Sequence, residues 1–160
     1  NNFKKIITVL IIWNFSNFGL RVSAFTLSMN LQICFFILNP FEPMPFVSVT
    51  TNQFLSQSDK AELLTELSFK CAEILGKSED YVMVRLNLDE SIFFAGTAEP
   101  ALFAELFSIG LSAMDAPTLS FALCKFLSER LAIAPKRIYL NFHDVPREMW
   151  GWNGSTFAKN

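Results

Sequence analysis

Two polar side chains with hydrogen-bonding capacity lie two residues apart in the segment IYLNFHD, Ile138–Asp144. Alternate side chains of a strand point to opposite faces, so Tyr139, Asn141 and His143 share one face while the apolar residues between them point into the core. Tyr139 and Asn141 can therefore donate hydrogen bonds to a small ligand. The alternative is a polar or interfacial strand face that binds no ligand.

Conventional catalytic signatures are missing from the sequence. It has no glycine-rich phosphate loop, no G-x-S-x-G motif, no metal-ligand cluster and a single histidine. Its three cysteines, Cys34, Cys71 and Cys124, form no C-x-x-C motif, which indicates reduced, buried thiols rather than a disulfide framework or a zinc site. A formal net charge of -2 gives no basic surface for nucleic acid.

Composition divides the 160-residue chain into two parts. Residues 1–44 contain four charged side chains, Lys4, Lys5, Arg21 and Glu42, whereas residues 45–160 have the mixture expected of one globular domain. The chain starts at Asn1 rather than Met, and we expect residues 1–44 to lie outside the mature fold. A spurious upstream translation is the first explanation, a targeting segment the second, and an integral part of the fold the third.

The domain is expected to begin with a strand, a helix and a second strand. PFVSVTT (residues 45–51) alternates like a strand. Apolar residues then recur at helical spacing from Leu63 to Leu75, after a serine cap at Ser56 or Ser58 and before a stop at Gly76. Residues 81–87 predict the second strand, and residues 92–94 a short additional one.

The second half repeats this order. Residues 102–110 suit a strand that ends at Gly110, and a helix starts at Asp115 and Pro117 and is expected to stop at Pro135. Residues 138–144 are the last strand, and crossover helices between parallel strands place both helices on one face of a single sheet. The fold is thus a two-layer α/β domain whose other sheet face needs cover, for which a closed symmetric assembly is the economical solution.

Residues 45–158 resemble the macrophage migration inhibitory factor family of the tautomerase superfamily. The matching segments are Met44-Pro45 before a strand, Gly76-Lys77 after the first helix, GTAEPALFAELFSIG (residues 96–110), SERLAIAPKRIYLNFHD (128–144) and GWNGSTFA (151–158). The resemblance implies two βαβ repeats that form a four-stranded mixed sheet with two helices on one face. It also implies a homotrimer with the sheets facing inward.

The resemblance further implies the residues of a catalytic site. Pro45, exposed as the first residue when Met44 is removed, matches the catalytic base, and Lys77 matches the lysine that binds the substrate carboxylate. Ile109 matches a wall of the pocket, and Tyr139 and Asn141 match residues contributed by a neighbouring subunit. The apolar lining is matched by Phe46, Trp152 and Phe157, with Trp150 where the family usually has a smaller residue.

These matches predict a cofactor-independent keto-enol tautomerase for phenylpyruvate-like and dopachrome-like substrates. An α-amino group titrates near ~8, and burial beside a lysine lowers its pKa, so that it is a free base at neutral pH. An amide bond from Met44 removes this basicity. Ala101-Leu102-Phe103-Ala104 replaces the C-x-x-C of some members, so no thiol-disulfide oxidoreductase activity is expected.

Two other functions stay open on the sequence alone. One is a cytokine-like signalling protein that binds a cell-surface receptor, and the other is an inactive trimeric pseudoenzyme that keeps residues 1–44. We expect a cytoplasmic protein, or one secreted without a conventional signal peptide. Neither apolar run of the first 44 residues, Ile6–Trp13 or Leu31–Leu38, reaches the ~20 residues of a membrane-spanning helix.

Overall fold

The computed structural model describes residues 44–159. Four strands form one sheet in the order β2-β1-β3-β4, with β1 at Phe46–Thr51, β2 at Met83–Asn87, β3 at Leu102–Ser108 and β4 at Ile138–Asp144. β1 runs parallel to β2 and β3 parallel to β4, while the central pair β1 and β3 is antiparallel. The mixed sheet of two βαβ repeats is confirmed.

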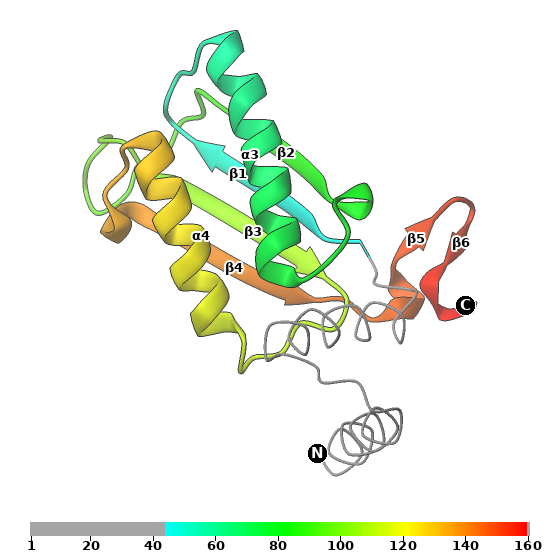
Figure 1. The fold of residues 1–160 in the computed structure, drawn as a ribbon. Coiled ribbons are helices and arrows are strands. Elements are labelled where there is room, and N and C mark those ends of the chain that lie inside the picture. Colours follow the sequence, from blue (N-terminus) through cyan, green and yellow to red (C-terminus); the bar gives the residue numbers. More distant parts are fainter. Residues whose placement is uncertain (1–43, 160) are drawn as a thin grey trace, which may run out of the picture. The chain divides into compact units, whose positions relative to one another are not determined.

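Two helices pack against one face of this sheet, α3 at Gln57–Leu75 and α4 at Ala116–Leu131 (Figure 1). Each helix connects two parallel strands, as the predicted crossovers require. The core lies between this helical layer and the sheet and contains alternate residues of the central strands, such as Val47, Val49 and Leu106. Within residues 44–159, no helix is long and apolar enough to cross a membrane.

Helix α3 has the boundaries that its sequence predicts. The Ser56 hydroxyl accepts a hydrogen bond from the Asp59 backbone N–H at 3.1 Å, which caps the first turn. Gly76 ends the helix with a φ of 64°, a left-handed conformation that glycine adopts without a steric penalty. This cap delivers the next residue, Lys77, directly to the end of the sheet.

Helix α4 ends earlier than predicted. It stops at Leu131, with Ala132 in the left-handed region at a φ of 52°, and not at Pro135. The residue before a proline is pushed out of the helical region, and Ala134 accordingly has a ψ of 134°. Ile133, only 1% exposed, turns back into the core between these two positions, and the Ser128 hydroxyl donates to its carbonyl at 2.7 Å.

The short strand predicted at residues 92–94 is wrong. Residues 88–101 form a loop whose only ladder contact is an isolated bridge between Phe94 and Thr97. Ala95 and Gly96 both have positive φ values, 50° and 77°, and reverse the chain at this point. The second strand also starts later than expected, at Met83, because Glu79–Tyr81 makes one turn of 3-10 helix.

The last described residues form a small hairpin outside the main sheet. After a 3-10 turn at Arg147–Met149, β5 (Gly151–Trp152) pairs with β6 (Ser155–Thr156), and a final turn covers Phe157–Lys159. Asn153 and Gly154 have φ values of 48° and 76°, as a two-residue hairpin turn needs. Figure 1 shows this hairpin beside the end of β4.

Candidate active site

Pro45 lies at the end of the sheet where β1 begins. It is fully buried, and its carbonyl accepts a hydrogen bond from the Met83 backbone N–H at 2.9 Å. The antiparallel register places Phe46 opposite Phe107, so the next position along, Pro45, lies on the side of Ser108. The start of β1 and the end of β3 thus meet at one edge of the domain.

Lys77 reaches the same edge from the end of α3. Its half-buried ammonium group donates to the Ser108 hydroxyl at 2.8 Å and to the Ile109 carbonyl at 2.9 Å. Two of the predicted site residues, Lys77 and Ile109, are therefore in direct contact, and both lie at the end of the sheet that carries Pro45. A lysine fixed in this way presents a positive charge to an anionic ligand at the site.

Ser108 is a site residue that sequence reasoning missed. Its side chain is fully buried on the helix-facing side of β3, in alternation with Leu102, Ala104 and Leu106. A buried hydroxyl needs a hydrogen-bond partner, and here that partner is the Lys77 ammonium group. The signal was present in the sequence, because a serine interrupts the otherwise apolar face of this strand.

On the opposite face of the sheet, three rings stack in a row from Phe46 through Phe107 to His143. The centroid distances are 5.9 Å and 4.1 Å, and the rings of the second pair, Phe107 and His143, are almost parallel, with an interplanar angle of 5°. The Arg85 guanidinium lies 5.2 Å from the Phe46 ring centroid and donates to the buried Ser48 hydroxyl at 3.0 and 3.2 Å. Phe46, predicted as apolar lining, is thus held next to Pro45 by both its neighbours.

His143 also faces a carboxylate. Its Nε2 lies 3.5 Å from Glu105 Oε1, a distance that suits an ion pair, yet this nitrogen is buried without a hydrogen bond of good geometry. A contact at this length is a hydrogen bond only when its angle is favourable, and the contact between His143 Nε2 and Glu105 Oε1 does not meet that condition. The two side chains are therefore in contact without a directional hydrogen bond.

Tyr139 and Asn141 do not reach Pro45 of their own chain. Tyr139 pairs with Phe103, which in turn pairs with Thr50, five positions along β1 from Pro45. At ~3.4 Å per residue this separation is about 17 Å along the strand direction. Tyr139 is 61% exposed and Asn141 is also exposed, so both residues are available to another molecule.

The three remaining predicted residues come together at the C-terminal hairpin. The Trp152 ring stacks on Phe157 with a centroid distance of 6.1 Å, and the Phe157 backbone N–H donates to the Trp150 carbonyl at 3.2 Å. Trp152 also contacts Tyr81 edge to face at 5.9 Å. Tyr81 lies two residues before Met83, whose amide binds the Pro45 carbonyl, so the hairpin connects to the Pro45 end of the sheet.

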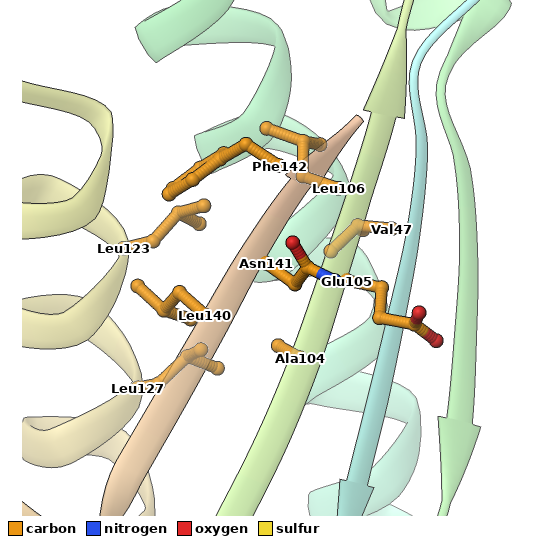
Figure 2. Close-up of a pocket in the computed structure, with 9 residues that line it drawn as sticks. All are labelled: Val47, Ala104, Glu105, Leu106, Leu123, Leu127, Leu140, Asn141 and Phe142. Atoms are coloured by element: carbon orange, nitrogen blue, oxygen red, sulfur yellow. The ribbon is translucent and has the colours of Figure 1, made fainter. Parts of the chain in front are cut away.

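The interior between α4 and the sheet offers no room for a substrate. Figure 2 shows Leu123 and Leu127 of α4 turned toward Leu140 and Phe142 of β4. The space between these side chains is too small for a water molecule. The hairpin forms an open hollow of about 620 Å³, lined by residues 151–156. A ligand that reaches Pro45 must therefore bind at the edge of the sheet and not inside the core.

The two cysteines in the described part of the chain are free thiols. Burial raises the pKa of the Cys71 thiol to about 12, which keeps it protonated and unreactive, and Cys124 is likewise a free thiol. Cys34 lies outside the described residues. Among residues 44–159, no three His, Cys, Asp or Glu side chains are grouped as metal ligands.

Comparisons with known proteins agree with this geometry. The model of the family described as "Macrophage migration inhibitory factor (MIF)" matches residues 44–158. The macrophage migration inhibitory factor of Meriones unguiculatus is 39% identical over 116 residues, which are 72% of this chain and all of the relative. The homologue from Trichuris trichiura is 37% identical over 115 residues, with 71% of this chain and all of the relative covered.

Solved structures give the same answer. The crystal structure of the macrophage migration inhibitory factor homologue from Prochlorococcus marinus has a TM-score of 0.66 and 38% identity, and the match covers 71% of this chain and 99% of that one. The structure of the factor from Trichinella spiralis has a TM-score of 0.64 and 31% identity, covering 69% and 98%. Over residues 44–158, this chain belongs to the macrophage migration inhibitory factor family of the tautomerase superfamily.

Proposed function

We propose that the chain beginning at Pro45 is a cofactor-independent keto-enol tautomerase for phenylpyruvate-like and dopachrome-like aromatic substrates. Membership of the family supports tautomerase or cytokine-like activity in general. The observation that carries the specific proposal is the meeting of Pro45, Lys77 and Ile109 at one edge of the sheet. A potential base and a fixed cation at one edge suit a substrate whose carboxylate adjoins a ketone that has an acidic C–H bond on its other side.

Pro45 would act through its nitrogen. As a first residue it carries a secondary amine, and its buried setting beside the Lys77 region lowers the pKa of that amine below the usual ~8. The free amine takes the proton from the carbon next to the carbonyl, and the C–H electron pair forms the enolate. The same ammonium proton then returns to the enolate oxygen, or to carbon in the reverse reaction, so no electron acceptor is needed.

The other residues would bind and orient the substrate. Lys77 holds the carboxylate, with Ile109 as a wall, and the aromatic ring lies among Phe46, Trp150, Trp152 and Phe157. Tyr139 and Asn141 reach the far end of the ring from a neighbouring subunit, because within one chain they lie about 17 Å and about 10 Å from Pro45 along the strand direction. We therefore propose a homotrimer in which the exposed sheet faces meet and each pocket contains two chains.

The test compares two N-termini. We expect the chain beginning at Pro45 to tautomerise phenylpyruvate, and the full 160-residue chain, as well as the Pro45→Gly variant of the shorter one, to be much slower. The full chain is the sharper comparison, because an amide bond from Met44 removes the basic nitrogen while residues 45–160 keep the same sequence. Equal rates for the two chains would refute the terminal amine as the base. An intact mass of each sample establishes its first residue.

Signalling is the second candidate, since the relatives are named as factors that inhibit macrophage migration. A cell-surface receptor would be the partner, and a cytoplasmic protein exported without a conventional signal peptide would meet it. A migration assay separates the two roles, because the Pro45→Gly variant should lose catalysis and keep signalling. If residues 1–44 remain attached in the native protein, the chain is instead an inactive trimeric pseudoenzyme.

A further inference from the structure

One peptide group of the candidate site connects two charged side chains. The Ile109 carbonyl accepts from the Lys77 ammonium group at 2.9 Å, and the Gly110 N–H of the same peptide group donates to the Asp144 carboxylate, also at 2.9 Å. In a planar trans peptide group, the C=O and N–H bonds point in opposite directions. Lys77 and Asp144 therefore bind opposite edges of a single peptide group.

The Asp144 carboxylate is itself held in place. Its Oδ1 atom accepts a second hydrogen bond, from the Leu111 N–H at 3.2 Å. Its backbone ends β4 in register with Ser108, the last residue of β3, and the Val145 N–H donates to the Ser108 carbonyl at 3.0 Å. Asp144 thus reaches the turn after β3 from a neighbouring strand whose position is fixed by the sheet.

The turn after β3 depends on this anchor. Gly110 has a φ of 78°, in a region that glycine enters and leaves without a steric penalty. A peptide group beside such a glycine rotates easily, and a rotation would turn the Ile109 carbonyl away from the Lys77 ammonium group. The two hydrogen bonds that Asp144 accepts, from Gly110 and Leu111, oppose this rotation.

The charge of Asp144 also strengthens the contact that Lys77 makes. A carboxylate that accepts from a peptide N–H makes the carbonyl oxygen of the same group more negative, because linked hydrogen bonds polarise one another. The ammonium group polarises the peptide group in the same sense from its other edge. Both hydrogen bonds involve a charged partner, which makes them stronger than bonds between neutral groups.

We propose that Asp144 is a positioning residue of the carboxylate-binding site, which acts on Lys77 through the Ile109–Gly110 peptide group. This inference rests on the proposed function, in which Lys77 holds the substrate carboxylate. The Ile109 carbonyl and the Ser108 hydroxyl together set the direction of the ammonium group. When Asp144 no longer holds the peptide group, one of these two acceptors is lost or turned, and the cation is less well aligned with an anionic ligand.

The binding test uses 3-phenylpropionate, an aromatic carboxylate without a ketone, and its uncharged methyl ester. The Kd of each ligand is measured by NMR titration of the chain beginning at Pro45, since the relatives consist of the matched 115 or 116 residues alone. We expect Asp144→Ala to weaken binding of the acid about three- to tenfold and to leave binding of the ester unchanged. Asp144→Asn keeps an acceptor oxygen without the charge and should give an intermediate value.

Asp115→Ala is the matched control. It removes the same charge a few residues beyond Gly110, where the carboxylate makes no capping hydrogen bond, and it should change neither Kd. The ratio of the two Kd values stays informative if a variant folds less well, because a loss of folded protein weakens acid and ester binding together. Equal weakening of both ligands by Asp144→Ala, or an acid Kd equal to that of Asp115→Ala, would overturn the inference.

Turnover of phenylpyruvate is measured separately. A chain that binds 3-phenylpropionate with these Kd values but does not tautomerise phenylpyruvate would refute the proposed catalysis and support the role of Asp144 in carboxylate binding. If the unmodified chain does not prefer the acid to the ester, Lys77 does not bind a carboxylate, and the role of Asp144 is refuted with it.

A spectroscopic measurement tests the shared peptide group without a ligand. Of the six glycines only Gly19 precedes Pro45, so ¹⁵N-glycine labelling of the shorter chain gives five amide signals. We expect Lys77→Met to move the Gly110 signal as well as that of its neighbour Gly76, although Lys77 contacts the carbonyl and not the amide. Lys70→Met, which removes a lysine paired with Glu73 on the same helix, should leave the Gly110 signal in place. A Gly110 signal that is unmoved in Lys77→Met would contradict the inference.

Discussion

Removing the Ser108 hydroxyl tests the role of Lys77 without touching the lysine. In the Ser108→Ala variant the Lys77 ammonium group loses the partner at 2.8 Å and keeps the Ile109 carbonyl at 2.9 Å. The alanine methyl group fits where the fully buried serine was. We therefore expect a folded protein whose cation is less well aligned with the substrate carboxylate.

The size of the effect follows from the hydrogen bond that is lost. A hydrogen bond to a charged group contributes about 1.5–3 kcal/mol. Because the Ile109 carbonyl still accepts from Lys77, we expect about 1 kcal/mol of this to appear in substrate binding, which raises KM for phenylpyruvate roughly fivefold. The value of kcat should change little, because Pro45 is unaltered and the carboxylate contact is the same in the ground state and the transition state.

The assay measures KM for phenylpyruvate and for its methyl ester, which has no negative charge. We expect Ser108→Ala to raise KM only for the acid, and to add nothing in a Lys77→Met background. Ser128→Ala is the matched control, since it also deletes a hydroxyl hydrogen bond, of 2.7 Å, but at the end of α4. An equal rise in KM for acid and ester, or no rise at all, would refute carboxylate binding by Lys77.

Three further predictions concern the domain itself. At pH 8, a thiol reagent should modify Cys71 about a thousandfold more slowly in the folded chain than after unfolding, since burial raises the pKa of its thiol to about 12. The rate in the folded chain should increase with pH. Equal rates in the folded and the unfolded chain would contradict this prediction. Gly76→Ala should lower the free energy of unfolding in urea by about 1 kcal/mol, because alanine is strained at a φ of 64°. Crowding is not the cause, since nothing lies within 4 Å of the added Cβ atom. An unchanged midpoint of urea unfolding would exclude this strain. Arg130→Met should lower the free energy of unfolding by less than about 1 kcal/mol, because the two glutamates of α3 that pair with Arg130 are 65% and 46% exposed. A concentration of 1 M salt should abolish the difference.

Much of the fold could be predicted because its signals are local. The leucine spacing of α3, its Ser56 cap and its Gly76 stop all lie within one segment, as does the alternation of β4. The loop at residues 88–101 could not be predicted, because its conformation depends on Arg137, which is 43 residues from Phe94 in the sequence. Three large apolar residues in a row resemble a strand unless that distant partner is known.

The candidate site was predictable only in part for the same reason. Resemblance to a family pointed to Pro45, Lys77 and Ile109, and the structure brings the ends of their elements together. Ser108 was missed because strand periodicity assigns it to the core, and only the length of α3 brings Lys77 to it. The edge-to-face contact between the Phe94 and Tyr139 rings joins a loop to a strand and has no sequence signal.

The distance between Tyr139 and Pro45 within one chain has a genetic consequence. In the proposed homotrimer, a polypeptide whose amine is blocked would still supply its Tyr139 to the adjacent copy, so that two different defective alleles would complement each other in one cell. With random mixing of a Pro45 variant and a Tyr139 variant, about one pocket in four receives an intact half from each. Partial recovery of activity, rather than complete loss, is therefore expected when a variant at one end of this sheet is combined with a variant at the other.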